Sequence, residues 1–295
     1  MYNKCEDKAS VLNEYFTSVF TKEDTSNIPS LDSYSFPDIS PITITNAGVL
    51  ALLSNLKIHK ASGPDKIPAS LLKNLATSLA PALTMIFKAS LSQSSLPSEW
   101  KIANIVPIFK KGNRNNPGNY RPVSLTCICS KLLEHIVYSH IFSRYNILIK
   151  EQHGFRQFRS CETQLIATIH DLAENLDNGK QTDVILLDFT KAFDKVPHGH
   201  LCSKLNQLGI NGSLLSWIKC FLADRYQQVT INGEKSSPAL VTSGVPQGTF
   251  TVLAPLLFLC YINNITQDIS CKIKLYADDV LIYNTIASEV TYKEI

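Results

Sequence analysis

The chain has 295 residues, 44% of them hydrophobic, and its 28 basic and 25 acidic side chains leave a formal net charge of +3. This length and composition fit one large or two modest folded domains and exclude an intrinsically disordered chain. No apolar run approaches the roughly 18 residues that a membrane span needs, and the first residues lack the apolar core of a secretory signal. From the sequence we therefore expect a globular protein without a membrane segment.

Eight cysteines are scattered along the chain, and only Cys127 and Cys129 lie close together. This spacing fits neither a zinc-binding module nor the disulfide framework of a small secreted domain. We therefore expect reduced thiols in an intracellular protein, most of them packed as small hydrophobic side chains. The choice between nucleus and cytoplasm stays open, as does the oligomeric state.

In the first half of the chain, apolar residues recur mainly at helical spacing. The Ser-, Asp- and Pro-rich residues 26–42 indicate a linker, and the Gly-, Asn- and Pro-rich residues 112–119 a mobile loop. Between these two segments, residues 102–109 favour a strand. We expect helices at residues 9–20, 46–56, 69–79, 83–91 and 130–145.

The second half of the chain mixes helices with strands. Four consecutive apolar residues at 184–187 predict a strand buried on both faces, with Asp188 at its end. Residues 227–242 favour a hairpin. We expect further helices at residues 163–178, 200–208, 213–222 and 256–262. Helices first, and then helices and strands together, predict an α+β fold.

Two adjacent carboxylates, Asp278 and Asp279, stand between apolar runs at residues 273–275 and 280–283. Neighbouring side chains in a strand point to opposite faces, so a continuous strand would drive one carboxylate into the core. A hairpin that turns at the two aspartates avoids this cost and presents them together at a sheet edge. On turn chemistry alone, an ordinary solvated turn is the alternative. Together with Asp188, the pair forms a ligand set for two divalent cations such as Mg²⁺.

A basic strip lies between Lys101 and Leu133, a stretch with six basic residues and no acidic one. The net charge of the whole chain is too small to indicate a nucleic-acid partner. Local positive charge of this kind, however, suits a polyphosphate or a nucleic-acid backbone. For Lys110, Lys111 and Arg114 taken singly, a solvated loop is an equally good interpretation.

Several segments in a fixed order resemble the reverse transcriptases of non-LTR (LINE-type) retrotransposons. They are KASGPDKIP (60–68), PIFKKGNRNNPGNYRPVSLT (107–126), QHGFRQFRSCETQL (152–165), LDFTKAFDKVPH (187–198), a stretch within residues 205–233, SGVPQG (243–248) and YADD (276–279). The resemblance implies the fingers and palm of a right-hand polymerase. It places a helical amino-terminal extension at residues 1–95, fingers with part of the palm at 96–180, and an incomplete palm at 181–295.

The resemblance also implies a reaction and a set of site residues. An RNA-directed DNA polymerase transfers nucleotides from dNTPs to the 3′-hydroxyl of a DNA primer on an RNA template, with two Mg²⁺ ions or with Mn²⁺ as a substitute. The implied catalytic metal ligands are Asp188, Asp278 and, in an assisting role, Asp279. The implied dNTP-binding residues are Arg121, Lys110, Phe193, Gln247 and Gly248. The implied primer and template contacts are Tyr276, Arg156 and Arg159.

Several of these positions have a plain structural alternative. Phe193 would exclude a ribose 2′-hydroxyl by its bulk, but it could instead be an ordinary core residue, and the same holds for Tyr276. Arg156 and Arg159 could belong to a solvated face. Asp194, six residues after the first aspartate, is expected to be structural.

Two features depart from the family pattern. Two extra residues follow Gly248, and Ala254 stands where the family has glycine. An insertion of two residues inside a helix would rotate its face by roughly 200°, whereas the preceding loop could absorb it. The chain also ends at Ile295, before a thumb, so the resemblance predicts a retroelement fragment with poor or no processive synthesis.

These departures leave alternatives to an active polymerase. One is an inactive fragment that only binds nucleic acid through the basic strip. Another is a different palm polymerase, such as an RNA-copying enzyme or an intron-type reverse transcriptase. Phe193 and the length of the resemblance argue against the second alternative.

Overall fold

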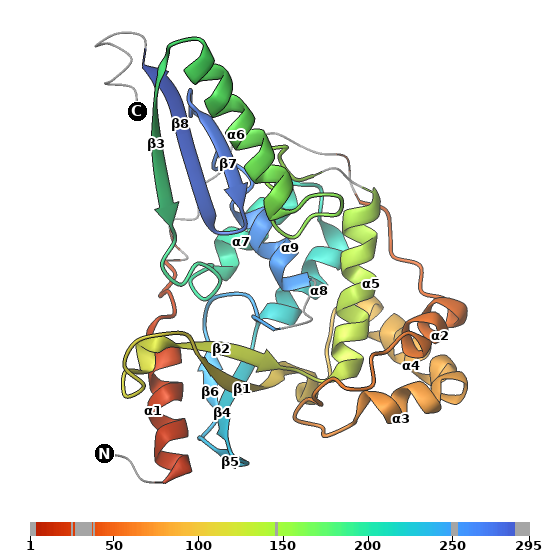
Figure 1. Ribbon diagram of the computed structural model, residues 1–295. Coiled ribbons are helices and arrows are strands. Elements are labelled where there is room, and N and C mark those ends of the chain that lie inside the picture. Colours follow the sequence, from red (N-terminus) through yellow and green to blue (C-terminus); the bar gives the residue numbers. More distant parts are fainter. Residues whose placement is uncertain are drawn as a thin grey trace.

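The computed structural model describes residues 4–24, 26, 37, 39–144, 147–248 and 253–286. Two β-sheets lie in different parts of the molecule, with helices between and beside them (Figure 1). The mixture of helices and sheets confirms the predicted α+β class. No helix formed by these residues is long and apolar enough to cross a membrane.

The helices of the first hundred residues are α1 (Cys5–Ser18), α2 (Asn46–Ser54), α3 (Ala69–Asn74) and α4 (Ala76–Gln93). The predicted break between residues 79 and 83 is wrong, because α4 runs continuously through Pro81. A proline inside a helix removes one backbone hydrogen bond. Leu83 and Phe87 on the same helix are buried, and this packing offsets the lost bond.

The larger sheet consists of β1 (Ile102–Phe109), β2 (Tyr120–Leu125), β4 (Arg225–Ile231), β5 (Glu234–Lys235) and β6 (Ala239–Val241). β1 has the predicted bounds and pairs antiparallel with β2, a strand that was not predicted from the sequence. On its other side, β1 pairs in parallel with β4, which begins more than a hundred residues later. α1 covers this sheet with Ala9, Leu12 and Phe16, all of them buried.

The remaining helices are α5 (Ile128–Arg144), α6 (Cys161–Asp177), α7 (His198–Gln207), α8 (Gly212–Leu222) and α9 (Leu253–Tyr261). The largest apolar cluster lies among α4, α5, α7, α8 and α9. Within it, Trp217 stacks on Phe221, and its indole N–H donates a hydrogen bond to Ser90 Oγ at 2.9 Å. A tryptophan whose polar atom has a partner can be buried without leaving an unsatisfied donor.

The smaller sheet consists of β3 (Gln181–Asp188), β7 (Lys272–Tyr276) and β8 (Asp279–Ile286) in the antiparallel order β3-β8-β7. α6 runs along this sheet (Figure 1). Tyr283 on β8 is fully buried, and its hydroxyl donates a hydrogen bond to Asp171 on α6. This contact attaches the hairpin of β7 and β8 to the helix.

Strand β3 departs from the prediction of burial on both faces. Val184, Leu186 and Leu187 are 46%, 79% and 45% exposed. Val184 and Leu186 lie on one face of the sheet, and α6, which contacts β3, can cover only one face of this strand. An apolar run reports the hydrophobicity of a strand, whereas its burial depends on which elements pack against it.

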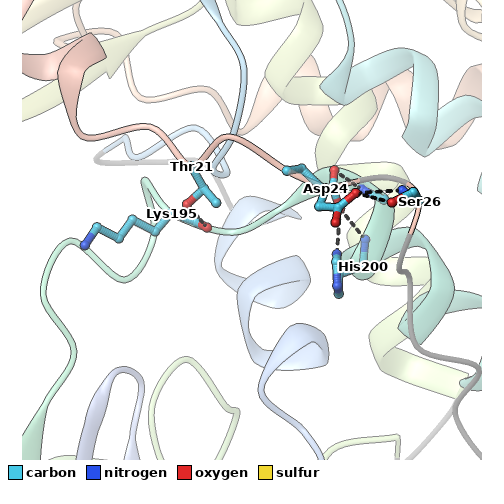
Figure 2. Close-up of polar contacts among 7 residues, drawn as sticks. Thr21, Asp24, Ser26, Lys195 and His200 are labelled. Atoms are coloured by element: carbon cyan, nitrogen blue, oxygen red, sulfur yellow. Dashed lines mark hydrogen bonds and ion pairs between the residues drawn. The ribbon is translucent and has the colours of Figure 1, made fainter.

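The segment that follows α1 contacts the region around the start of α7. Thr21 Oγ1 donates a hydrogen bond to the carbonyl of Lys195 at 2.8 Å (Figure 2). The Glu23 carboxylate accepts hydrogen bonds from the backbone N–H groups of Gly199 and His200, both at 2.9 Å. The first N–H groups of a helix have no intrahelical partners, so Glu23 satisfies two of them. The chain between β3 and α7 is therefore held from the side of α1.

Candidate active site

Backbone pairing brings Asp188 and Asp279 to the same end of the smaller sheet. They are register partners at the last residue of β3 and the first residue of β8. Directly opposed residues of antiparallel strands point to the same face. Tyr276 also pairs with Asp279, so the turn consists of Ala277 and Asp278. The predicted hairpin is confirmed, with its turn one residue earlier than expected.

The three carboxylates interact electrostatically. Burial raises the pKa of Asp278, and the negative charges of Asp279 and Asp188 raise it further, while Arg121 acts in the opposite direction. Asp188 and Asp279 are exposed, whereas Asp278 is half-buried. Among the described residues, no ion pair joins any of the three to a basic side chain. The sheet end therefore carries concentrated negative charge.

A divalent cation is the natural partner of such a charge cluster. Carboxylate oxygens are the donors that Mg²⁺ prefers, and partial exposure leaves room for the water molecules that it retains. The donor types of this site fit the ion. Over the residues that the structure describes, however, no three His, Cys, Asp or Glu side chains are arranged so that they could hold a metal together. The backbone gathers the carboxylates at one edge without closing a ligand shell.

The loop at residues 243–248 is attached to the chain that follows β3. The Val245 N–H donates a hydrogen bond to the carbonyl of Phe193 at 2.9 Å. A Cβ on Gly244 would lie 2.7 Å from the carbonyl oxygens of Phe193 and Asp194, and Gly244 has a φ of +85°. Both the contact and the positive φ require glycine. The loop at residues 243–248 and the chain around Phe193 are therefore in backbone-to-backbone contact.

The hairpin of β1 and β2 carries the two basic residues predicted to bind a dNTP. Arg121 on β2 and Lys110 just after β1 are both exposed. Burial raises the pKa of Asp194, against the opposing charges of Lys191 and Arg121. The positive charge of Lys110 also lowers the pKa of Asp194. The positive charge of Arg121 lowers the pKa of Asp278 as well. The hairpin therefore contributes positive charge near this aspartate.

The aromatic candidate, Phe193, lies in the interior. Its side chain is 6% exposed, stacks on Phe258 at a centroid distance of 4.2 Å and meets Phe155 edge-on at 6.1 Å. These contacts support the packing interpretation, and selection against a 2′-hydroxyl stays a prediction. Tyr276 is half-buried at the end of β7, immediately before the turn that carries Asp278.

Gln247 and Gly248 are half-buried beside β2. The carbonyl of Gln247 accepts a hydrogen bond from the Ser124 N–H at 2.6 Å, which attaches the loop to the larger sheet. The predicted two-residue insertion falls within residues 249–252, outside the described residues. Ala254, at the position where the resemblance implies glycine, is fully buried in α9.

The two arginines predicted to contact the template are bonded to the nearby backbone. Arg156 Nη1 donates a hydrogen bond to the carbonyl of Ile149 at 2.6 Å, and Arg159 Nη1 donates one to the carbonyl of Gln152 at 3.3 Å. Template contact by these groups stays a prediction. The same segment contains Gln152 and Gly154, for which no role was predicted from the sequence. They touch the turn at Ala277, a long-range contact that no local pattern shows.

The sequence matches a family of known function over most of this framework. A family model described as reverse transcriptase (RNA-dependent DNA polymerase) matches residues 108–293. The matched region contains β2, the smaller sheet, the loop at 243–248 and all three aspartates. The match therefore covers the three carboxylates and the two basic residues Lys110 and Arg121.

Curated relatives extend the similarity toward the amino terminus. The probable RNA-directed DNA polymerase from transposon BS of Drosophila melanogaster is 30% identical over 278 residues, which cover 87% of this chain and 30% of that protein. The RNA-directed DNA polymerase from mobile element jockey of the same organism is 28% identical over 81% of this chain and 27% of its own length. The probable polymerase from transposon X-element is 30% identical over 76% of this chain and 25% of its own length. The chain thus spans less than a third of the length of these relatives.

Proposed function

The chain belongs to the reverse transcriptase (RNA-dependent DNA polymerase) family, and on this premise we propose that it forms the nucleotidyl-transfer site of an RNA-directed DNA polymerase from a LINE-type retrotransposon. One observation carries the proposal. The register of β3 and β8 sets Asp188 opposite Asp279, and the two-residue turn adds Asp278 at the same sheet end. Three carboxylates from two distant segments thus lie at one end of one sheet, and this arrangement supports the proposal.

In this proposal Asp188, Asp278 and Asp279 would hold two Mg²⁺ ions, with Mn²⁺ as a substitute. Cations held by these carboxylates would supply the charge that activates the primer 3′-hydroxyl and stabilises the departing pyrophosphate. The protein supplies the positions of the carboxylates. Strand pairing fixes the Cα atoms of Asp188 and Asp279, and the hairpin turn fixes that of Asp278. A rigid backbone of this kind lowers the reorganisation that the reaction requires.

The incoming dNTP would bind beside the basic hairpin and the loop at residues 243–248. Arg121 is suited to a triphosphate because a guanidinium can donate two parallel hydrogen bonds to phosphate oxygens, and Lys110 adds a second charge. Gln247 and Gly248 would lie near the same nucleotide, because the carbonyl of Gln247 accepts a hydrogen bond from Ser124 on β2. Phe193 would limit the room beside the sugar. Its stacking on Phe258 would keep the ring in one position.

The primer end and the template would lie beside the smaller sheet. Tyr276 precedes the aspartate turn and would contact the primer, while Arg156 and Arg159 would face the template. We assign residues 1–95 to a helical extension, 96–180 to fingers with part of the palm, and 181–295 to palm. β4, β5 and β6 lie in the last of these ranges but share a sheet with β1 and β2. The proposed fingers and palm are therefore joined by strand pairing.

The test is primer extension by the 295-residue chain on an RNA template with a DNA primer, Mg²⁺ and labelled dNTPs. Asp188→Asn should abolish incorporation, because it removes one of the central carboxylates. Asp183→Asn is the matched control on the same strand. At the usual rise per residue, Asp183 lies about 17 Å from the sheet end. Its carboxylate accepts a hydrogen bond from Gln181 Nε2. Equal incorporation by the two variants and the parent would refute the site.

A second candidate function is nucleic-acid binding without catalysis, and the exposed positive charges of Arg121 and Lys110 favour it. Binding of a template–primer duplex can be measured by fluorescence anisotropy. Arg121→Ala with Lys110→Ala should weaken binding and reduce its dependence on salt. A folded chain that binds the duplex but incorporates no nucleotide would favour this second function over the first.

A further inference from the structure

Gln152 is a buried side chain, 2% exposed, that contacts the turn carrying the aspartates. Its Oε1 accepts hydrogen bonds from the N–H of Ala277 at 2.8 Å and from the N–H of Gly154 at 2.7 Å. Its Nε2 donates a hydrogen bond to the carbonyl of Ala277 at 3.3 Å. A carboxamide can both accept and donate, so one side chain holds both polar backbone groups of Ala277.

The backbone around Gln152 follows the same hairpin. The His153 N–H donates a hydrogen bond to the carbonyl of Leu275 at 2.8 Å, and the Leu275 N–H donates one to the carbonyl of Glu151 at 3.0 Å. A Cβ on Gly154 would lie only 2.3 Å from the nitrogen of Ala277, so a glycine is needed for this approach. The segment thus lies against the turn at backbone contact distance.

We propose that Gln152 is a positioning residue for the aspartate turn, and that its carboxamide fixes the peptide planes on either side of Ala277 so that Asp278 and Asp279 present their carboxylates together. The inference rests on the proposed function, because the position of the turn matters for the reaction only if Asp278 and Asp279 bind the metal ions. Among the described residues, the Gln152 side chain forms no hydrogen bond with the side chain of Asp278 or Asp279.

Two observations favour positioning over simple packing. First, Ala277 has a φ of +56°, an unfavourable conformation for a residue with a Cβ, so the turn needs external contacts to keep it. Second, the carbonyl of Gln152 accepts hydrogen bonds from Arg156 Nη1 at 3.4 Å and Arg159 Nη1 at 3.3 Å. The two guanidinium groups hold the residue that in turn holds Ala277.

The experiment compares Gln152→Leu with the full parent chain. Leucine has a similar size but neither accepts nor donates hydrogen bonds. Hydrogen exchange at the Ala277 amide should become about tenfold faster, as expected for the loss of one hydrogen bond. The affinity for Mn²⁺, measured by electron paramagnetic resonance without nucleic acid, should fall about 10- to 100-fold, the usual effect of removing a residue that orients metal ligands. Gln157→Leu, at an exposed site in the same motif, is the matched control and should match the parent.

The two readouts separate the possible results. Unchanged exchange at Ala277 would overturn the positioning role, and so would faster exchange with unchanged Mn²⁺ affinity. If the parent itself shows no Mn²⁺ binding that Asp278→Asn removes, the proposed function fails and Gln152 is only a structural contact. If Gln152→Leu does not fold, Gln152→Met replaces it, because methionine is unbranched like glutamine and has no amide donor or acceptor. Faster exchange at the Ala277 amide and a lower Mn²⁺ affinity are then expected again, and the absence of either would overturn the proposal.

Discussion

The helical centre of the molecule and its smaller sheet are stabilised in different ways. In the centre, large side chains such as Trp217 and Phe258 are almost completely buried and stack on other rings. The apolar cluster on the smaller sheet has three buried residues among those described, and Leu186 on β3 is 79% exposed. The candidate catalytic carboxylates stand on the sheet with the smaller apolar cluster.

The difference indicates how the aspartates are positioned. Packing of large side chains fixes the centre, because a close-packed interior resists changes of shape. At the end of the smaller sheet, strand register and hydrogen bonds to the turn, such as those between Gln152 and Ala277, hold the backbone in place. Substitutions in the centre should therefore alter stability, and substitutions at the sheet end should alter function with small effects on stability.

The largest loss of stability is expected in the helical centre. Trp217→Ala removes a fully buried ring, its stacking on Phe221 and its hydrogen bond to Ser90, and should lower the free energy of unfolding by about 3–5 kcal/mol. Chemical denaturation measures the change. Met85→Ala on the exposed side of α4, where Met85 is 72% exposed, is the control. A loss below 1 kcal/mol for Trp217→Ala would contradict the packing described for the centre.

A smaller loss is expected where the loop at 243–248 meets the chain after β3. Gly244→Ala places a Cβ against two carbonyl oxygens at a positive φ and should cost on the order of 2–3 kcal/mol. Gly179→Ala has a similar φ of +66° with open space around the Cβ, so it isolates the cost of the conformation alone, about 1 kcal/mol. Thermal unfolding of both variants gives the contribution of the contact by difference. Equal losses would show that the contact is not tight.

Removing one negative charge from the sheet end should slightly raise the free energy of unfolding, in contrast to the losses above. Asp279→Asn relieves the repulsion between directly opposed carboxylates and should stabilise the chain by a few tenths of a kcal/mol at low salt, because the residue is exposed and screened. The gain should disappear at high salt. It should also disappear when Mg²⁺ is added, because a cation bound at the proposed site would stabilise the parent. A gain that is independent of both would place its cause elsewhere.

The smallest effect is expected on the exposed face of β3. Leu186→Thr keeps a β-forming residue at an exposed site and should change the free energy of unfolding by less than about 0.5 kcal/mol. Urea denaturation is sensitive enough to detect a larger change. A loss above 1 kcal/mol would mean that another surface covers Leu186 in solution, and analytical ultracentrifugation would then show whether it belongs to a second copy.

The local elements of this fold were largely predictable. The strand at 102–109 and the hairpin around residues 273–283 follow from apolar patterns and turn residues, which act over a few neighbours. The break expected before Leu83 was wrong because tertiary packing overrode the local effect of Pro81. The burial expected for β3 was wrong because an apolar run does not reveal whether other elements cover the faces of the strand.

The sequence by itself determined the three aspartates, the basic strip and the α+β class, because each depends on residue type and on short-range spacing. Only the tertiary structure decided that β1 pairs with β4, that Asp188 faces Asp279 across β3 and β8, and that Gln152 holds Ala277. These contacts join residues that are about ninety to more than a hundred positions apart. Their formation depends on how the whole chain lowers its free energy, and no local pattern encodes that choice.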